Sequence, residues 1–269
     1  MRLKSALRRG VAAAVIAGIV VSSGIPAYAK TWDIADGDIT VKGASDESGN
    51  YNNVKQGEKD FEKDEGETVI TGESDKNTVN IDTSKGDVDV TFDDLKIDVS
   101  GKKEGDGSDD SPVRESKAAV TVKGDHDAAI ELDGDNELKS GGYNAGLEKN
   151  EHESKGTLTI KDDKGKDGSL TAEGGFGGAG IGGGIESTGS NITIRGGTIE
   201  AVGGSNAAGI GDGAGAWSEI DPDAPSSNPN NIIISGDAEV EAKAGASTGG
   251  ETAAVSYTHL RAHETPEHL

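Results

Sequence analysis

The chain has 269 residues, of which 42 are glycine, 3% are aromatic and none is cysteine. This composition excludes a helix-rich globular domain and favours repetitive β-structure or partial disorder. The lack of cysteine also excludes a disulfide scaffold, a thiol nucleophile and a thiolate metal site. The net charge of -23 argues against nucleic acid and anionic lipid as partners, because both are bound through Lys and Arg.

Residues 1–29 have the three parts of a secretory signal peptide. A basic start precedes an apolar run at 11–21, and the segment ends with Ala27-Tyr28-Ala29. The apolar run is too short for a membrane span, so we expect cleavage before Lys30. The mature protein is therefore predicted to be secreted or held at the cell surface, without a segment inserted in the membrane.

Residues 30–117 are expected to form an N-terminal cap followed by early, irregular coils. Apolar and polar residues alternate in several short pieces, from 37–41 to 95–99, and this alternation is typical of a strand with one buried face. The polar stretch 43–66 is predicted to be a loop or a loosely ordered cap. Residues 100–117 are predicted to be a charged, exposed insertion.

Residues 118–254 repeat one short pattern in regular coils. Ile181 and Ile210 are 29 residues apart, and so are Ala172 and Ala201. A repeat of this length indicates stacked coils rather than one globular core. Clusters of Gly, Asn and Asp separate the strand pieces, because tight corners need residues that tolerate a positive φ.

The strand pieces fall into three columns that recur in a fixed order. This order predicts an all-β, three-sided solenoid in which successive coils lie roughly 4.8 Å apart. The apolar residues of the columns are Ile130, Leu132, Leu158, Ile160, Ile192, Ile194, Ile232 and Ile234 in the first; Leu138, Leu170, Ala172, Ile199, Ala201, Val240 and Ala242 in the second; and Leu147, Ile181 and Ile210 in the third.

The end of the chain, residues 255–269, breaks this pattern. Residues 255–265 resemble the conceptual translation of a transposase-type sequencing-library adapter. We therefore expect a non-native tail here and a solenoid that is truncated at its C-terminal end. For the same reason His259, His263 and His268 are not taken as a metal site.

Three blocks of the sequence, 130–138, 178–184 and 191–201, carry a resemblance to a known family. They are similar to the secreted carbohydrate-binding domain-containing proteins of anaerobic, mostly Gram-positive bacteria, over residues 31–250. The resemblance implies a right-handed parallel β-helix related to pectate lyases and, as in some members, binding of plant polysaccharide with calcium. The matched residues are inward apolar positions and corner glycines, so they predict the fold better than the ligand.

Two turns gather oxygen ligands of the kind that calcium prefers. Because Asp is also an ordinary turn residue, solvated turns are the alternative, and no other cofactor is expected. The spacing matches neither an EF-hand loop nor the calcium-binding nonapeptide repeat. The candidate ligands are Asp133, Asp135 and Asn136 in one turn, and Asp162, Asp163 and Asp167 in the other.

Two aromatic residues, Tyr143 and Trp217, lie between strand pieces and are the candidates for contact with a sugar ring. Each is either an exposed platform or a cover for the edge of a coil. The acidic charge disfavours a polyanionic glycan unless cations bridge it. We therefore expect a neutral polysaccharide, or a host or cell-wall glycan, as the partner.

Catalysis is not expected. Bases suited to a polysaccharide lyase are sparse. A glycoside hydrolase needs two carboxylates at a set separation, and Asp93-Asp94 is the one adjacent acid pair beside a strong strand. The sequence thus favours a non-catalytic, carbohydrate-binding or adhesive module. Two alternatives remain open at this point: a passive stalk of a larger surface protein, and a lyase or hydrolase.

Overall fold

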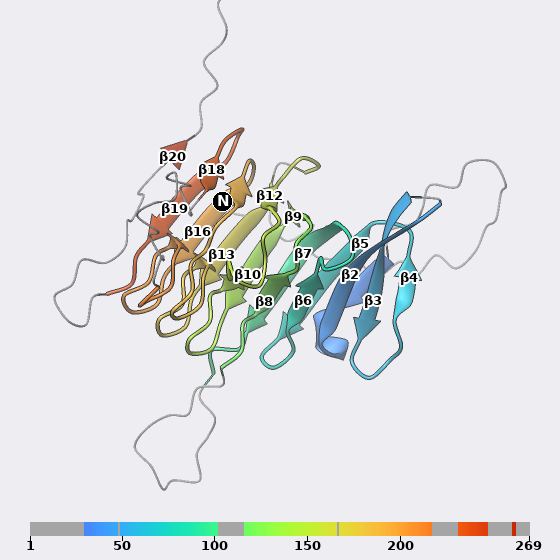
Figure 1. The fold of residues 1–269 in the computed structure, drawn as a ribbon, viewed down its shortest axis with the longest axis horizontal. Coiled ribbons are helices and arrows are strands. Elements are labelled where there is room, and N and C mark those ends of the chain that lie inside the picture. The colour runs from blue at the N-terminus through green and yellow to red at the C-terminus, as the bar shows by residue number, and fades with distance from the viewer. Residues whose placement is uncertain are drawn as a thin grey trace, which may run out of the picture.

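The computed structural model describes residues 30–47, 49–101, 116–165, 167–216, 231–246 and the strand at 260–261. The predicted signal peptide, Trp217 and most of the predicted adapter-derived tail lie outside these ranges. The described chain is an elongated stack of β-strands (Figure 1) with one short helix, η1 (Ile34–Asp36). Within it, no helix has the length and apolar character needed to cross a membrane.

The strands form two sheets. The twelve-stranded sheet runs in the order β18-β15-β12-β9-β7-β10-β13-β16-β19-β20, with β5 beside β7 and β1 beside β5. Its strands are β1 (Lys30–Asp33), β5 (Thr68–Ser74), β7 (Val88–Asp98), β9 (Ala128–Asp133), β10 (Asp135–Lys139), β12 (Leu158–Lys161), β13 (Ser169–Glu173), β15 (Ile192–Ile194), β16 (Thr198–Val202), β18 (Ile232–Ile234), β19 (Glu239–Lys243) and β20 (Leu260–Arg261).

The eight-stranded sheet runs in the order β17-β14-β11-β8-β6-β2-β3-β4. It is parallel from β17 to β2 and antiparallel from β2 to β4. Its strands are β2 (Ile39–Asp46), β3 (Gly49–Gln56), β4 (Glu62–Asp64), β6 (Val79–Asp82), β8 (Val120–Lys123), β11 (Leu147–Glu148), β14 (Ile181–Gly182) and β17 (Ile210–Gly211).

Strand β7 turns a corner, and this divides the larger sheet into two arms. Its residues 88–93 pair with β9 and its residues 96–98 pair with β10. Asp94 lies between the two halves with φ 50, and Gly134, Gly197 and Gly236 occupy the corresponding corners of later coils with φ 62, 81 and 64. Left-handed backbone is open to Gly and tolerated by Asp. The fold is therefore all-β with a strongly curled parallel sheet.

The predicted apolar columns coincide with the two arms and the smaller sheet. Ile160 lies beside Ile130 and Ile194, and Ile194 lies beside Ile234. In the smaller sheet Leu147, Ile181 and Ile210 are aligned. These side chains are buried, apart from the partly buried Ile234 of the last rung, and each fully buried Ile contributes about 1.5–3 kcal/mol.

The pairing register refines the first column. Leu158 lies beside Ala128, and Leu132 lies beside Phe92. Parallel pairing is also continuous across residue 118, where the sequence predicts that the regular coils begin, because β6 pairs with β8 and β7 with β9. The early coils are thus paired in parallel like the later ones, with one irregularity, a register shift between β5 and β7 at residues 71–73.

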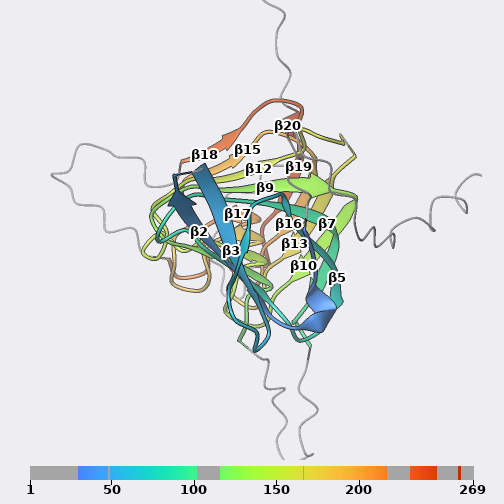
Figure 2. The same cartoon turned by 90° about the vertical axis from the view of Figure 1, so that its right-hand side faces the viewer.

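An antiparallel hairpin, β2–β3 with β4, lies at the N-terminal end of the stack (Figure 2). Strands β3 and β4 occupy most of the segment predicted as a loop, so that prediction is wrong for them. The buried positions of β3 are Asn52, Val54 and Gln56, and only one of them is apolar. Asn52 donates to Thr68 Oγ1 at 2.9 Å, which compensates for its burial.

Lys149 occupies an inward position after β11 and is completely buried. Its Nζ donates to the carbonyl oxygens of Ser154 and Ser190, each at 2.9 Å. Burial lowers the pKa of Lys149 to about 8. The ammonium therefore links the turn that follows β11 to the turn that precedes β15.

We predict that Lys149→Met destabilises the fold by about 2 kcal/mol, because it leaves two buried carbonyl groups without a donor. Thermal unfolding followed by circular dichroism measures the change. Lys155→Met is the matched control, since Lys155 is exposed in the same turn, and it should leave the melting temperature unchanged. An unchanged melting temperature for Lys149→Met would contradict the role given to its ammonium.

Candidate functional site

The outward side of the first arm is a polar face, called here the first face. It is made by β5, β7, β9, β12 and β15, and one row across it consists of Thr91, Glu131 and Lys161, which are aligned neighbours on successive strands. A second row consists of Asp89, Ala129 and Thr159. Parallel register thus brings residues 30 to 40 positions apart in the sequence into lateral contact.

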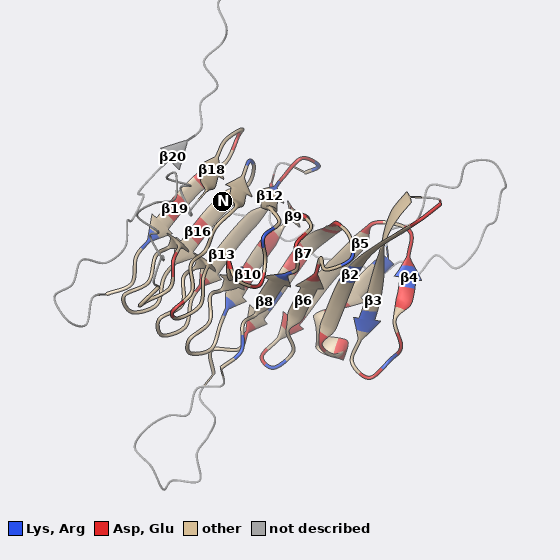
Figure 3. Ribbon diagram, viewed as in Figure 1, with Lys and Arg blue, Asp and Glu red and all other residues tan. Residues whose placement is uncertain are grey.

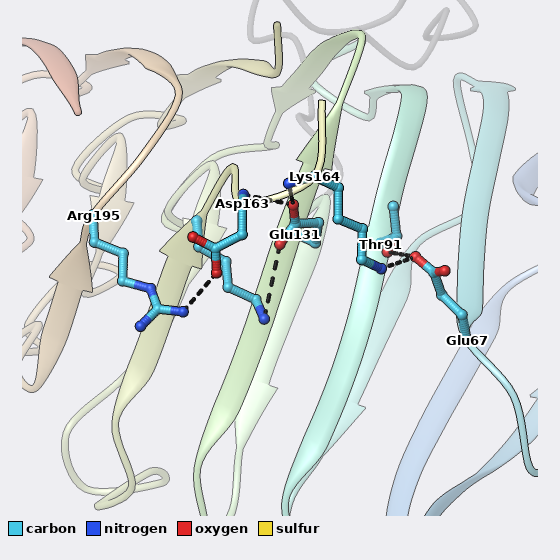
Figure 4. A network of polar contacts seen from close by, with 7 residues as sticks. Glu67, Thr91, Glu131, Asp163, Lys164 and Arg195 are labelled. Carbon is cyan, nitrogen blue, oxygen red and sulfur yellow. Dashed lines mark hydrogen bonds and ion pairs between the residues drawn. The ribbon is translucent and has the colours of Figure 1, made fainter. Parts of the chain in front are cut away.

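A short segment after β12, residues 162–165, folds back across the first face (Figure 4) and is called here the strap. Glu131 Oε1 accepts hydrogen bonds from the backbone N–H groups of Asp163 and Lys164, each at 2.7 Å. Lys164 Nζ reaches over β9 and β7 to form an ion pair with Glu67. Asp163 in turn binds Arg195 at 2.7 Å.

A groove of about 360 Å³ lies beside the strap. Thr91, Glu131 and Lys161 of the first face, Lys164 of the strap and Tyr51 of β3 are among the residues that line it. This volume is within the range of ligand pockets, roughly 300–1,000 Å³.

Glu131 is the most unusual group in the groove. Its side chain is only 4% exposed, and Oε2 accepts no hydrogen bond within the described chain; the nearest cation is Lys161 Nζ at 3.8 Å. Glu67 stays ionised, because hydrogen bonds from Lys164 and Thr91 lower its pKa. A buried polar atom without a partner is rare and calls for a physical explanation.

A second candidate lies at the turn between the second arm and the smaller sheet. Tyr143 and Phe176 occupy equivalent turns of successive coils, and the Tyr143 N–H donates to the Phe176 carbonyl at 2.8 Å. Their rings meet edge to face at 6.1 Å between centroids, and the residues are 53% and 44% exposed. We call them the aromatic pair.

The backbone around the aromatic pair is tightly constrained. Tyr143 has φ 73, a region that bulky residues rarely adopt, and its carbonyl accepts a hydrogen bond from the Ile185 N–H at 2.8 Å. A Cβ on Gly175 would lie 1.8 Å from the carbonyl oxygen of Gly141. The two turns therefore stack too closely for a side chain at Gly175, and the exposed rings stand at the positions that follow the Gly-Gly pairs.

The sequence predicts a sugar contact at Tyr143 but not at Phe176. A signal for Phe176 was present, because each ring follows a Gly-Gly pair, at 141–142 and at 174–175. Trp217, the other predicted platform, lies outside the described residues.

The predicted calcium ligands are only partly brought together. Asp162, Asp163 and Asp167 line one hollow of about 340 Å³, together with Asp237 and Glu239, which lie two coils further along the stack. Asp163 is held by Arg195 there, and Asp162 Oδ2 accepts the Gly168 N–H at 3.1 Å.

The other predicted turn is used for structure. Asn136 is buried; its Oδ1 accepts the Leu95 N–H at 2.9 Å and its Nδ2 donates to the carbonyls of Asp133 and Ser169. Asp135 accepts the Ser169 hydroxyl at 3.0 Å. Among the described residues no three His, Asp or Glu side chains are grouped so as to hold a metal ion. Calcium stays a prediction.

The acid pair considered for a hydrolase lies at the corner of β7. Asp94 occupies the left-handed corner itself, and its Oδ1 accepts the Asp135 N–H at 2.9 Å. Asp93 lies beside Asp133 on β9. Burial, together with the charges of Asp133 and Asp94, raises the pKa of Asp93.

Charges on the rest of the stack are mixed rather than segregated. Figure 3 shows acidic and basic residues close to one another along the strands. On the second arm Lys139 pairs with Glu137 at 2.6 Å, and Lys243 pairs with Glu200 at 2.7 Å. Such exposed pairs contribute little to stability, but they balance the charges that parallel register places side by side.

Glu148 supports the turn that carries Tyr143. Its Oε2 accepts the Ala145 N–H at 3.1 Å, and the side chain is buried. Burial raises the pKa of Glu148 to about 7 from its ordinary 4.5, and the charge of Glu153 adds to this effect. Between pH 4.5 and pH 7, the Glu148 carboxyl group is therefore protonated in the folded state and ionised in the unfolded state.

The stability of the fold is therefore predicted to fall as the pH rises from 4.5 to 7, by about 3 kcal/mol from this group. Glu148→Gln should remove this slope and melt at a higher temperature than the wild type at pH 7.5. Lys149 adds little slope in this window, because below its folded-state pKa of about 8 its ammonium is protonated in both the folded and the unfolded state. Equal slopes for both proteins in thermal melts from pH 4.5 to 7.5 would refute the assignment.

Comparison of the chain with protein-family models, with curated proteins and with solved structures finds no match. The family resemblance of the repeat blocks accordingly stays an expectation. The function has to be argued from the side chains of the first face and of the aromatic pair.

Proposed function

We propose that the chain is a non-catalytic, carbohydrate-binding module of a secreted or cell-surface protein. Its proposed architecture is a right-handed, three-sided parallel β-helix. This architecture is supported by three columns of aligned parallel strands. Two of them are the arms that meet at β7, and the third is the smaller sheet. Such a stack is a rigid scaffold on which side chains keep fixed positions.

The observation that carries the function is the exposed aromatic pair. Aromatic rings bury much apolar area in a contact and lose little conformational entropy in doing so. The edge-to-face arrangement, at an interplanar angle of 89°, leaves ring faces turned in two directions. A sugar ring presents an apolar face of C–H groups, which can stack on such a ring while its hydroxyl groups remain hydrated.

The charge of the protein narrows the class of glycan. With a net charge of -23 the chain repels polyanionic glycans unless cations bridge the two. Neutral polysaccharide, or a host or cell-wall glycan of low charge, is the better partner. Calcium at the hollow lined by Asp162, Asp163 and Asp167 would be an aid to that contact and is not required for stacking on the aromatic pair.

A passive stalk is the second candidate function. It is favoured by the parallel pairing that continues from β2 to β17 in the smaller sheet and across both arms of the larger one. A stalk requires stiffness and no ligand. Only the binding function requires the aromatic pair. Replacing its two residues therefore distinguishes a binding module from a stalk.

We predict that the purified protein is retained on at least one insoluble neutral polysaccharide, such as cellulose, mannan or chitin, in a pull-down assay. Tyr143→Ala with Phe176→Ala should lower the retained fraction severalfold, because both stacking surfaces of the aromatic pair are gone. Phe61→Ala is the control, since Phe61 is a similarly exposed aromatic residue, at 43%, on the hairpin at the N-terminal end. No retention of the wild type on any of these, with or without calcium, would favour the stalk.

A further inference from the structure

We propose that the groove beside Glu131 is a second saccharide site, which accepts a neutral, hydroxyl-rich sugar unit and rejects uronic acids. This inference rests on the proposed glycan-binding function and assigns to it a site on another side of the stack. The aromatic pair lies in the turns after β10 and β13, whereas the groove lies on the outward side of β7, β9 and β12.

Parts of the chain that are distant in sequence build this groove. Asn50 and Tyr51 come from the N-terminal hairpin, Thr91 and Glu131 from the first face, and Lys164 from the strap. Two contacts fix the strap (Figure 4). Glu131 accepts hydrogen bonds from its backbone N–H groups, and Glu67 forms an ion pair with the Lys164 ammonium. The groove is thus held in shape before any ligand arrives, which lowers the entropic cost of binding.

Glu131 offers a ligand a charged hydrogen-bond acceptor. Its Oε1 is saturated by the two strap N–H groups, while its Oε2 is buried and accepts no hydrogen bond from the described residues. A hydroxyl group is the natural donor to such an oxygen, and a hydrogen bond to a charged acceptor is stronger than one between neutral groups. We expect the Lys161 side chain to turn toward a sugar oxygen as a hydroxyl approaches Oε2.

The remaining charges decide which sugar is accepted. The two lysines of the groove already face acids, since Lys164 is paired with Glu67 and Lys161 lies 3.8 Å from Glu131. Asp87 and Asp89 also line the groove and leave it with an excess of negative charge. A uronate carboxylate would meet repulsion there. The amide of Asn50 can donate to and accept from neutral hydroxyl groups, and the Thr91 hydroxyl, which donates to Glu67, can accept from them.

Isothermal titration calorimetry with defined hexasaccharides tests this site. The probes are neutral hexamers of cellulose, mannan and laminarin, with hexagalacturonate as the uronic acid and a chitosan hexamer as the amine. The protein in which both Tyr143 and Phe176 are replaced by Ala isolates the groove. It should retain one binding site for a neutral hexamer and show no heat with hexagalacturonate.

Two groove variants are made in that background. Glu131→Gln keeps an acceptor for the strap but replaces the free oxygen with a donor, and it should weaken binding of the neutral hexamer by about tenfold or more. Asp89→Asn changes an exposed carboxylate and should leave the fold intact. Because it halves the excess of negative charge in the groove, it should make measurable the heat of hexagalacturonate binding that the parent lacks. Melting temperatures show whether Glu131→Gln is folded.

The outcomes separate this inference from the function on which it rests. If the aromatic-pair variant loses all binding while the wild type binds, the groove site is overturned and the proposed function stands. If the wild type binds none of the hexamers and no insoluble polysaccharide, both are overturned. Binding of the chitosan hexamer alone, or equal affinities in Glu131→Gln and its parent, would also overturn the groove site.

Discussion

Close stacking of backbone at one set of glycine corners is the constraint on which the rest of the structure depends. A Cβ on Gly175 would lie 1.8 Å from the Gly141 carbonyl oxygen, one on Gly204 would lie 1.7 Å from that of Gly175, and one on Gly245 would lie 1.7 Å from that of Gly204. Real Cβ atoms do not approach so closely, so any side chain in this row would push two coils apart. The parallel ladders on either side need the coils to stay at strand spacing, and glycine at each level is what permits it.

The side chains that are available for binding lie on the outside of this stack. Tyr143 and Phe176 directly follow glycines of these close-packed corners, and both side chains are exposed. On the first face, the fixed spacing of the strands aligns Thr91, Glu131 and Lys161 in one row. Function in this architecture comes from turns and outward rows, because the inward positions are occupied by the stack of apolar side chains.

Much of the stack could be predicted from the sequence, because alternation of apolar and polar residues reports directly on which side of a strand is buried. Ile181 and Ile210 share a register that their 29-residue separation already indicates. The hairpin at the N-terminal end could not be predicted in this way. Its inward residues include Asn52 and Gln56, whose burial is made possible by hydrogen bonds to parts of the chain that periodicity does not reveal.

The candidate sites were harder to predict for a related reason. Tyr143 could be named from its place in a glycine-rich turn, but its pairing with Phe176 depends on how successive coils are aligned. The groove depends on longer separations still, since Lys164 and Glu67 are 97 residues apart. Glu131 looks like any outward acid of a strand, and only the strap that folds over it makes it a buried carboxylate.

The alignment of the coils can be measured directly by disulfide trapping, because the chain has no cysteine of its own. Thr159 and Thr193 are aligned neighbours on the outward side of β12 and β15, and Ile233 is the next residue in that row. Neighbouring rungs lie roughly 4.8 Å apart, within the range of a disulfide, and alternate rungs lie beyond it. Under mild oxidation the pair Thr159→Cys and Thr193→Cys should give a linked peptide in mass spectrometry, whereas Thr159→Cys with Ile233→Cys should not. Linkage of the second pair in preference to the first would contradict the aligned stack from which every other conclusion follows.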